Sequence, residues 1–154
     1  MPIEIVSVID RPDLVPVAAN WHWRQWGRKN GFSLADEEAW VAAHTATLGP
    51  NQAWVLLDDG TPAGMATFEF HDLDDRPDLS PWLANLVVDE AFRGRGHAIR
   101  LVGHTEAACI AAGIPTLHLN TEGAEALYAR LGWHEIGTAE HMGHPVTIMH
   151  KQLA

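Results

Sequence analysis

Apolar and polar residues change their spacing along this chain in a way that predicts strands and helices in turn. Apolar residues at every second position indicate a half-buried strand, and spacings of roughly three to four residues indicate an amphipathic helix. Strands are therefore expected at residues 3–8, 53–57, 62–70, 82–88, 116–120, 133–139 and 146–153. Helices are expected at residues 10–27, 33–48, 96–112 and 124–131. This order mixes hairpins with helical crossovers, so the predicted fold class is α+β with a mixed sheet.

Three local signals set the expected ends and the burial of these elements. Asp10 is expected to cap the first helix, with Pro12 in its first turn. The segment Ser33–Asp36 has the spacing of a capping box, for a second helix that runs to about Leu48. The run Trp82–Val88 is almost continuously apolar, which predicts a central strand buried on both faces.

The composition is that of a folded chain with one core. The chain has 154 residues, of which 47% are hydrophobic and 19% are charged, so a single domain is expected over residues 1–154. No apolar run approaches the roughly 20 residues that span a bilayer, and the first residues lack the basic cluster of a signal peptide. Cys109 is the one cysteine, which excludes an internal disulfide framework. We therefore expect a cytoplasmic protein with no membrane partner.

The charge distribution favours a small anionic ligand over a nucleic acid. A formal net charge of −10 repels phosphate backbones, so no nucleic-acid partner is expected. The stretch Arg93–Arg100 nevertheless carries three arginines close together. Such a patch on an acidic protein indicates an anionic ligand bound at one place, although an ordinary solvated helix start has the same composition.

The same stretch has the layout of a phosphate cradle. A strand runs into a loop with Gly94 and Gly96 and then directly into a helix. Glycines let the backbone present several N–H groups to one point, and the helix N-terminus adds partial positive charge. Ala98 is small enough for a ligand to lie close to the backbone. The P-loop is excluded because Gly-Lys-Ser/Thr is absent, and the dinucleotide-binding loop because Ile99 stands at the third glycine position.

Two segments resemble motifs of the GNAT (GCN5-related N-acetyltransferase) superfamily. Residues 93–98, Arg-Gly-Arg-Gly-His-Ala, resemble its pyrophosphate motif Gln/Arg-x-x-Gly-x-Gly/Ala. Residues 124–133, Ala-Glu-Ala-Leu-Tyr-Ala-Arg-Leu-Gly-Trp, resemble its segment Ala-x-x-Leu-Tyr-x-x-Leu-Gly-Phe. The resemblance spans about residues 82–153. It implies a mixed, mostly antiparallel central sheet with splayed central strands, flanked by about four helices, and acetyl-CoA as co-substrate without a metal.

The resemblance also implies roles for individual residues. Tyr128 would be the general acid beside the cofactor sulfur, and Thr121 stands where many relatives have Asn. Asn85 and Asn120 stand where relatives often carry a Glu. The implied cofactor-binding residues are Leu86, Val87, Val88, Arg93, Gly94, Arg95, Gly96, His97, Ala98, Ile99 and Thr121.

Acetyl transfer to an amine needs a proton acceptor, an oxyanion donor and a proton for the leaving thiolate. Tyr128 is the single tyrosine and can supply that proton, although a core aromatic has the same helical position. The oxyanion donor is expected to be the backbone N–H of Val88. The catalytic candidates are Tyr128, Glu69 and Asn120. For the base, Glu69, His71, His118 and Glu122 stay open, and a neutral amine needs no base at all.

The acceptor is the least defined part of the prediction. A primary amine is expected, on a small molecule or a peptide, and a non-catalytic acyl-CoA-binding or sensing module is the alternative. The acidic segments 71–78 and 36–38 favour a cationic or neutral acceptor. One of Trp23 and Trp26 is expected to line the acceptor pocket, with Trp21 in the core. His141 and His144 are expected in a structural turn, Cys109 to be inert, and a homodimer is left open.

Overall fold

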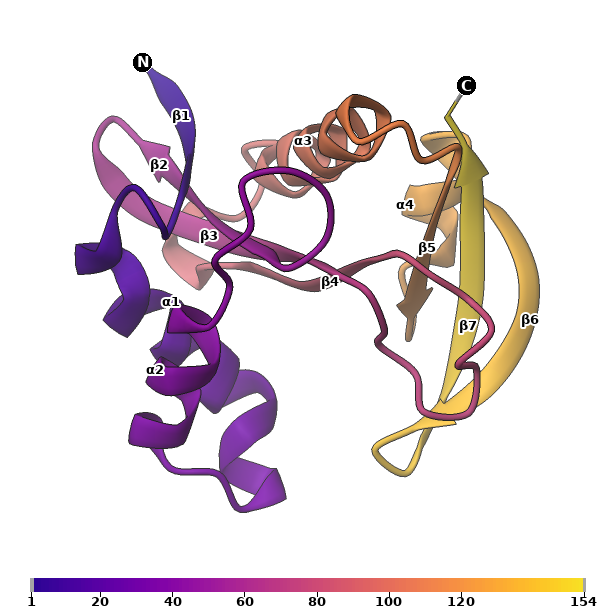
Figure 1. The fold of residues 1–154 in the computed structure, drawn as a ribbon, viewed down its shortest axis with the longest axis horizontal. Helices are drawn as coiled ribbons and strands as arrows, with labels where there is room; N and C mark the ends of the chain where they lie inside the picture. The colour runs from indigo at the N-terminus through magenta and orange to yellow at the C-terminus, as the bar shows by residue number, and fades with distance from the viewer. Residues whose placement is uncertain (1, 154) are drawn as a thin grey trace.

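One seven-stranded sheet organises the molecule in the computed structural model, which describes residues 2–153 (Figure 1). The strands are β1 Ile3–Ser7, β2 Gln52–Asp58, β3 Thr61–Glu69, β4 Trp82–Val88, β5 Thr116–Thr121, β6 His134–His141 and β7 His144–Gln152. Their order in the sheet is β1-β2-β3-β4-β5-β7-β6, and β4–β5 is the parallel pair among otherwise antiparallel neighbours. The predicted α+β class with a mixed, mostly antiparallel sheet is confirmed.

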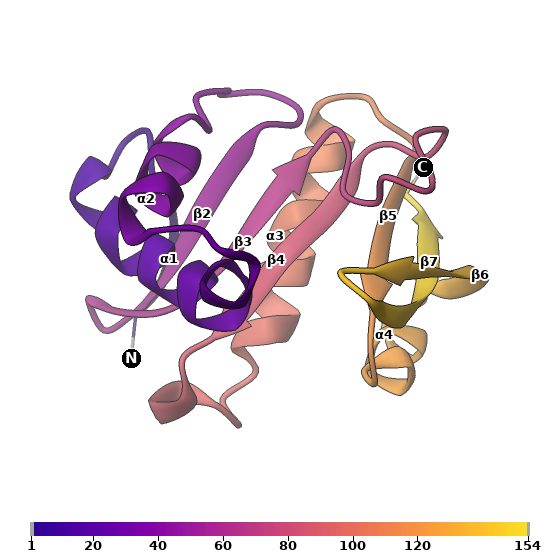
Figure 2. The same cartoon turned by 90° about the horizontal axis from the view of Figure 1, so that it is seen from below.

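Helices cover both faces of this sheet. The helices are α1 Val15–His22, α2 Leu34–Ala42, α3 His97–Ala111 and α4 Glu125–Arg130. Shorter helical turns are η1 Pro12–Leu14, the π-helical η2 Trp23–Gly27, η3 Arg28–Asn30 and η4 Glu90–Phe92. Figure 2 shows α1 and α2 in front of strands β2–β4, with α3 behind them. The four predicted helices are therefore present, with the first one divided into several pieces.

Two hydrophobic clusters hold these layers together. One packs α3 and α4 against the sheet and contains Leu101, Cys109, Phe68 and Tyr128. The other packs α1 and α2 against the opposite face, with Trp21 among its buried residues. Alternate residues of β2 enter different clusters, as Trp54 and Leu56 enter the first and Val55 and Leu57 the second.

The first helix does not begin where its sequence predicts. The N–H groups of Asp10 and Arg11 both donate to the Ser7 carbonyl, at 3.1 Å, so Asp10 belongs to the turn that ends β1. The first helical turn starts at Pro12 with no side-chain cap, and α1 itself starts at Val15. The prediction that Asp10 caps this helix was wrong because the turn uses it.

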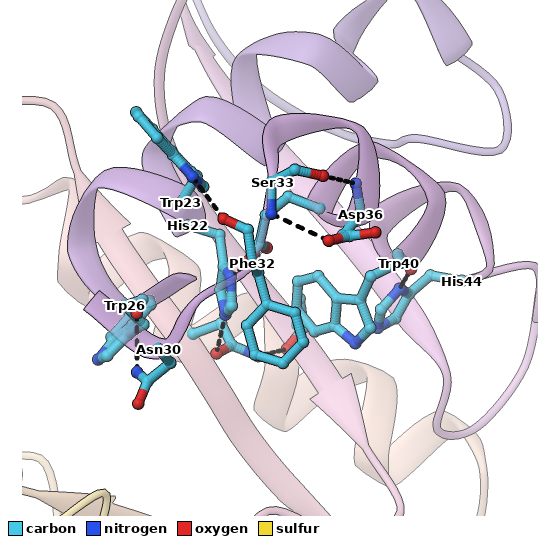
Figure 3. A network of polar contacts seen from close by, with 12 residues as sticks. His22, Trp23, Trp26, Asn30, Phe32, Ser33, Asp36, Trp40 and His44 are labelled. Atoms are coloured by element: carbon cyan, nitrogen blue, oxygen red, sulfur yellow. Dashed lines mark hydrogen bonds and ion pairs between the residues drawn. The ribbon is translucent and has the colours of Figure 1, made fainter. Parts of the chain in front are cut away.

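The second helix begins as predicted and ends early. The Asp36 N–H donates to Ser33 Oγ at 3.1 Å, and the Ser33 N–H donates to Asp36 Oδ2 at 2.9 Å, which confirms the capping box (Figure 3). Helix α2 ends at Ala42 and not near Leu48. His44 explains the early end, because its Nδ1 donates to the Trp40 carbonyl at 2.9 Å and so satisfies the last turn.

Strand β4 is buried only along its first half. Trp82, Leu83 and Ala84 are buried, whereas Leu86–Val88 are half-buried, so the expectation of burial on both faces was wrong for the second half. The reason is that pairing between β4 and β5 is limited to Trp82 and His118, after which the two strands diverge (Figure 2). The predicted splay of the central strands is thereby confirmed.

None of the helices within residues 2–153 has the length and apolar content that crossing a membrane requires.

Candidate active site

The glycine loop joins η4 to the N-terminus of α3. Gly94 and Gly96 have φ angles of 81° and 79°, a left-handed conformation that other residues adopt at a cost. A Cβ on Gly94 would meet no atom within 4 Å, so the space beside this loop is open. In the described chain, the successive N–H groups from Gly94 to Ile99 make no backbone hydrogen bond, and the first helical bond is donated by Arg100 to the Gly96 carbonyl. These free N–H groups fit an oxyanion such as a pyrophosphate.

The side chains of this loop mostly contact other residues of the same chain. His97 is buried, and its Nε2 lies 2.9 Å from Asp58 Oδ2, which also accepts a hydrogen bond from Arg95 Nη1 at 3.1 Å. The hydrogen bond from His97 and that from Arg95 hold the pKa of Asp58 below its ordinary value. Arg100 Nη1 donates to the Arg95 carbonyl at 2.6 Å. The arginines therefore brace the loop, and the backbone is left to bind an anion.

A groove of about 620 Å³ lies beside this loop, along the half-buried second half of β4. Val87, Val88 and Arg93 line it on the sheet side. Arg24 and Arg28 line it from η2 and η3, and they add positive charge that the sequence analysis did not single out. Of the predicted cofactor residues, Gly94, Arg95, Gly96, His97, Ala98 and Ile99 lie outside this groove, on the loop and the first turn of α3.

A second and larger cavity, of about 1050 Å³, opens between the two halves of the sheet. The structure brings the predicted catalytic residues Glu69, Asn120 and Tyr128 together in its wall, with Leu86 and Thr121. The wall combines α1, α2 and their connecting turns with the ends of β3, β4 and β5 and with the turn between β6 and β7. Residues from most of the chain thus meet at one place.

Tyr128 lines this cavity from helix α4. Its side chain is buried beside Trp133, with 6.2 Å between the ring centroids, and burial raises the pKa of Tyr128 to about 12. Within residues 2–153 the Tyr128 hydroxyl makes no hydrogen bond. Its oxygen is nevertheless not among the buried polar atoms that lack a partner, so it is accessible to solvent. The phenol therefore carries its proton at neutral pH and can donate it into the cavity. Tyr128 belongs to the core and to the cavity at once.

The wall of the large cavity is strongly acidic. Lys29 is the one lysine or arginine among its lining residues. The acidic lining residues are Asp36, Glu37, Glu69, Asp72, Asp74 and Glu122. Carboxylates around a partly enclosed space attract cations and repel acidic groups. The wall therefore favours a ligand that carries positive charge.

Asp72 is the most perturbed of these carboxyl groups. Asn120 donates to it, with 2.6 Å between Nδ2 and Oδ2. Burial raises the pKa of Asp72, and the charge of Glu69 acts in the same direction, while His141 and the hydrogen bond from Asn120 oppose the rise. Sequence analysis placed Asp72 in an acidic loop and missed it, because a loop gives no signal of burial.

Glu69 is held by a histidine. The Nε2 atom of His44 lies 2.8 Å from Glu69 Oε2, and its Nδ1 faces the Trp40 carbonyl. Both ring nitrogens face acceptors, which favours the doubly protonated ring. Burial lowers the pKa of His44, but the hydrogen bond and the charge of Glu69 outweigh burial and raise it above the ordinary value. The second oxygen of Glu69 makes no hydrogen bond in the described chain and is free for a ligand.

The remaining base candidates divide into two groups. His71 and Glu122 line the cavity, as do His141 and His144 from the β6–β7 turn. His118 does not line it, because its ring packs on Trp82 and its Nδ1 bonds the Pro81 carbonyl at 3.1 Å, and burial lowers its pKa. The residues His141 and His144 flank the turn of a hairpin, and no cluster of metal-ligating residues occurs within residues 2–153.

Aromatic residues form the outer wall of the cavity. Trp26 lines it, as does Trp40, which sequence analysis did not consider. Trp21 is buried, and its Nε1 donates to Asp89 Oδ2 at 3.1 Å, while Trp23 donates to the Phe32 carbonyl at 2.9 Å (Figure 3). The expectation that Trp21 is core and that one of the other two lines the pocket is confirmed.

Comparison with known proteins agrees with this geometry. The model of the acetyltransferase (GNAT) family matches residues 15–133, so this protein belongs to the GNAT acetyltransferases. A search of curated protein sequences gave no significant match. Its membership in this family makes the protein an acetyltransferase.

Solved structures share the fold over their whole length. An aminoglycoside 6'-N-acetyltransferase complexed with coenzyme A has a TM-score of 0.76 at 17% identity, with 100% of this chain and 98% of that chain covered. An N-acetyltransferase from Staphylococcus aureus Mu50 has a TM-score of 0.75 at 16% identity, with both chains fully covered at 100%. YncA from Salmonella typhimurium, with its cofactor acetyl-CoA, has a TM-score of 0.71 at 18% identity and coverages of 100% and 95%.

Proposed function

We propose that this enzyme transfers the acetyl group of acetyl-CoA to a primary amine that carries positive charge. The observation that carries the proposal is the acidic wall of the cavity that Tyr128 shares with Glu69 and Asp72. An alkylammonium group is attracted there before reaction, and a second ammonium group on the same acceptor gains the same attraction. The aromatic faces of Trp26 and Trp40 add favourable contacts for such a cation.

The reaction follows from what the cavity provides. The ammonium group loses a proton, and the free amine attacks the carbonyl carbon of the thioester. The C–N bond forms, and the nitrogen gives up its second proton to solvent. The C–S bond breaks, and the sulfur leaves as a thiolate that takes the proton of the Tyr128 phenol. The products are an acetamide and free coenzyme A, and the tyrosinate regains its proton from solvent. One proton is released for each amine that reacts.

Glu69 is the proposed acceptor of the amine proton, directly or through water. Its Oε2 is fixed by His44, its second oxygen has no hydrogen bond in the described chain, and the residue lines the cavity. Asn120, predicted as catalytic, is assigned a positioning role, because its amide is engaged with the Asp72 carboxylate. The glycine loop would hold the pyrophosphate through the N–H groups from Gly94 to Ile99.

The test is an acceptor panel assayed by release of free thiol. The panel contains polyamines, arylalkylamines, lysine peptides and acidic N-terminal peptides, and amino sugars are included because a structural neighbour is an aminoglycoside acetyltransferase. We expect the highest kcat/KM for acceptors with more than one ammonium group, and a decrease of that value with added salt. A preference for acidic peptides, or a cationic acceptor whose kcat/KM is independent of salt, would contradict the proposal.

Charge variants make the test specific to the cavity. Glu122→Gln and Asp74→Asn remove exposed carboxylates from the cavity wall, whereas Asp13→Asn removes an exposed carboxylate elsewhere. The first two should lower kcat/KM for polyamines and leave a neutral arylalkylamine less affected. The Asp13 variant should behave like the wild type with both acceptors.

A further inference from the structure

Strand β4 contains a bulge in its middle, at the point where it enters the large cavity. Thr67 pairs with Ala84 and Met65 pairs with Val87, so Asn85 and Leu86 together stand opposite Ala66. Asn85 has a φ of 54°, the left-handed conformation that non-glycine residues adopt rarely. Such a conformation persists only where the surrounding structure enforces it, and it commonly marks a functional site.

The side chain of Asn85 is bound from two sides. Its Nδ2 donates to Thr67 Oγ1 at 2.8 Å, and the Thr67 hydroxyl donates to the Ala84 carbonyl at 3.3 Å. The oxygen Oδ1 faces His22 Nε2 at 3.1 Å. Because the hydroxyl proton is committed to Ala84, the Asn85 amide must donate to Thr67 and present its oxygen to His22.

His22 is held in turn by a buried carboxylate. Its Nδ1 lies 2.5 Å from Oε2 of Glu37, a residue that is 4% exposed. Its ring also packs between Trp26 and Trp40, with centroid distances of 5.0 and 4.3 Å (Figure 3). Both ring nitrogens therefore face oxygens, and the ring is held from two sides by Glu37 and Asn85.

Gly27, in the helical segment after α1, leaves room for Glu37 beside His22. A Cβ on Gly27 would lie 2.0 Å from Glu37 Oε1, so glycine is required for the carboxylate to approach the backbone. Gly27 ends the π-helical turn Trp23–Gly27, and such turns often occur at functional sites. The two histidines of this region are thus used differently: His44 binds Glu69 in the cavity wall, while His22 binds the strand bulge.

We propose that His22, fixed by Glu37, is a positioning residue for acetyl transfer: it holds Asn85 in its left-handed conformation and thereby aims at the thioester oxygen those backbone N–H groups of Leu86–Val88 that face away from β3. The inference rests on the proposed acetyl transfer in this cavity. The bulge interrupts the ladder with β3 at Asn85 and Leu86, and past Trp82 strand β4 has no pairing with β5 on its other side, so backbone N–H groups that face this gap are free for an oxyanion. A shift of the bulge would turn these donors away while the glycine loop, on another segment, still binds the cofactor.

Two variants break the chain of contacts in different ways. His22→Phe keeps the stacked ring and removes both hydrogen bonds, and Glu37→Gln keeps the shape and removes the charge. We expect each to lower kcat by roughly 10²- to 10³-fold, the loss typical of an oxyanion donor, with little change in acetyl-CoA affinity by calorimetry. His104→Gln is the control, because His104 is a half-buried histidine that packs on Trp54, away from the cavity.

The variant Asn85→Gly distinguishes a positioning role of His22 from a role in fold stability alone. Glycine adopts positive φ without support, so His22→Phe should lower kcat much less in an Asn85→Gly background than in the wild type. Equal fold-losses from His22→Phe in both backgrounds would overturn the proposal. Melting curves show whether each variant folds. If His22→Phe does not fold, Glu37→Gln tests the same contact.

A spectroscopic measurement needs no acceptor. The infrared carbonyl band of carbonyl-¹³C acetyl-CoA should move to lower frequency when it binds the wild type, and the shift should be smaller with Glu37→Gln and restored by adding Asn85→Gly. Absence of any shift and of thiol release in the wild type would count against the proposed function itself. A normal wild-type shift that Glu37→Gln leaves unchanged would overturn only the role of His22 and Glu37.

Discussion

Asn120 on β5 donates a hydrogen bond to Asp72 in the loop before β4, with 2.6 Å between Nδ2 and Oδ2. This contact ties the loop to the strand on the far side of the splay, and it places a carboxyl group where burial opposes its charge. The protein therefore maintains a carboxyl group in the large cavity at some cost to its own stability.

Replacing Asp72 by Asn should stabilise the protein at neutral pH and weaken its activity. Because the pKa of Asp72 is raised in the folded state, the folded state holds the proton more tightly than the unfolded chain. The free energy of unfolding therefore falls as pH rises from about 3.9, the unfolded value, through the folded pKa, and Asn removes this decrease. Melting temperatures at pH 4 and pH 7 measure it. Asp75→Asn, exposed in the same loop, is the control, and a variant that melts below the wild type at pH 7 would contradict the prediction.

Tyr128→Phe should lower kcat by roughly 10²- to 10⁴-fold with little change in acetyl-CoA affinity, because the ring keeps its packing and only the proton donor is lost. Burial raises the pKa of Tyr128 to about 12, so the wild-type kcat should show no loss from tyrosine ionisation up to about pH 10. Rate profiles from pH 6 to about pH 10 test both statements. Full kcat in the Phe variant across this range would show that Tyr128 is structural.

Gly96→Val should abolish the melting shift that acetyl-CoA causes in the wild type. Valine resists a φ of 79°, and the strained loop would no longer present its N–H groups. At a concentration about 100 times its dissociation constant, the ligand should stabilise the wild type by about 2.7 kcal/mol. Gly113→Val is matched, since Gly113 has a φ of 72° and open space around it but ends α3 far from the loop. It should lose stability and keep the shift; equal ligand shifts in both variants would count against the loop as the cofactor site.

Cys109 should resist alkylation in the folded protein. It is fully buried, and burial raises its pKa to about 11, so roughly one thiol in a thousand is ionised at pH 8. Mass spectrometry after treatment with iodoacetamide should show no label until denaturant is added. Rapid labelling of the native protein would contradict this burial. Slow labelling also means that thiol-release assays measure coenzyme A alone.

The sequence predicts those structural features that depend on residues close to one another along the chain. The apolar run of β4, the glycines before α3 and the Ser33–Asp36 capping box all carry their signal within a few positions, and each was found where expected. Burial of the second half of β4 was mispredicted, because the gap beside it results from β5, a strand about thirty residues further along the chain.

The site could be predicted only in part, for the same physical reason. Tyr128 was found through its motif and Glu69 through its place at the end of a strand. The contact between His22 and Asn85 joins residues 63 positions apart, and no local pattern in Trp-His-Trp distinguishes a histidine that binds a strand from one at the surface. The buried position of His97 likewise depends on its contact with Asp58, which lies 39 residues earlier in the chain. Arg95 contacts the same carboxylate.

The divergence of β4 and β5 gives this sheet an internal edge. Strand pairing stops after Trp82 and His118, so the amides that face the gap in the second half of β4 lack a neighbouring strand. Open edges usually invite pairing with other chains, but this one is enclosed because the sheet continues through β5, β7 and β6. These amides should exchange rapidly with deuterium in the free enzyme and slowly once an extended molecule lies along them. We therefore expect an extended ligand to form backbone hydrogen bonds with this unpaired side of β4.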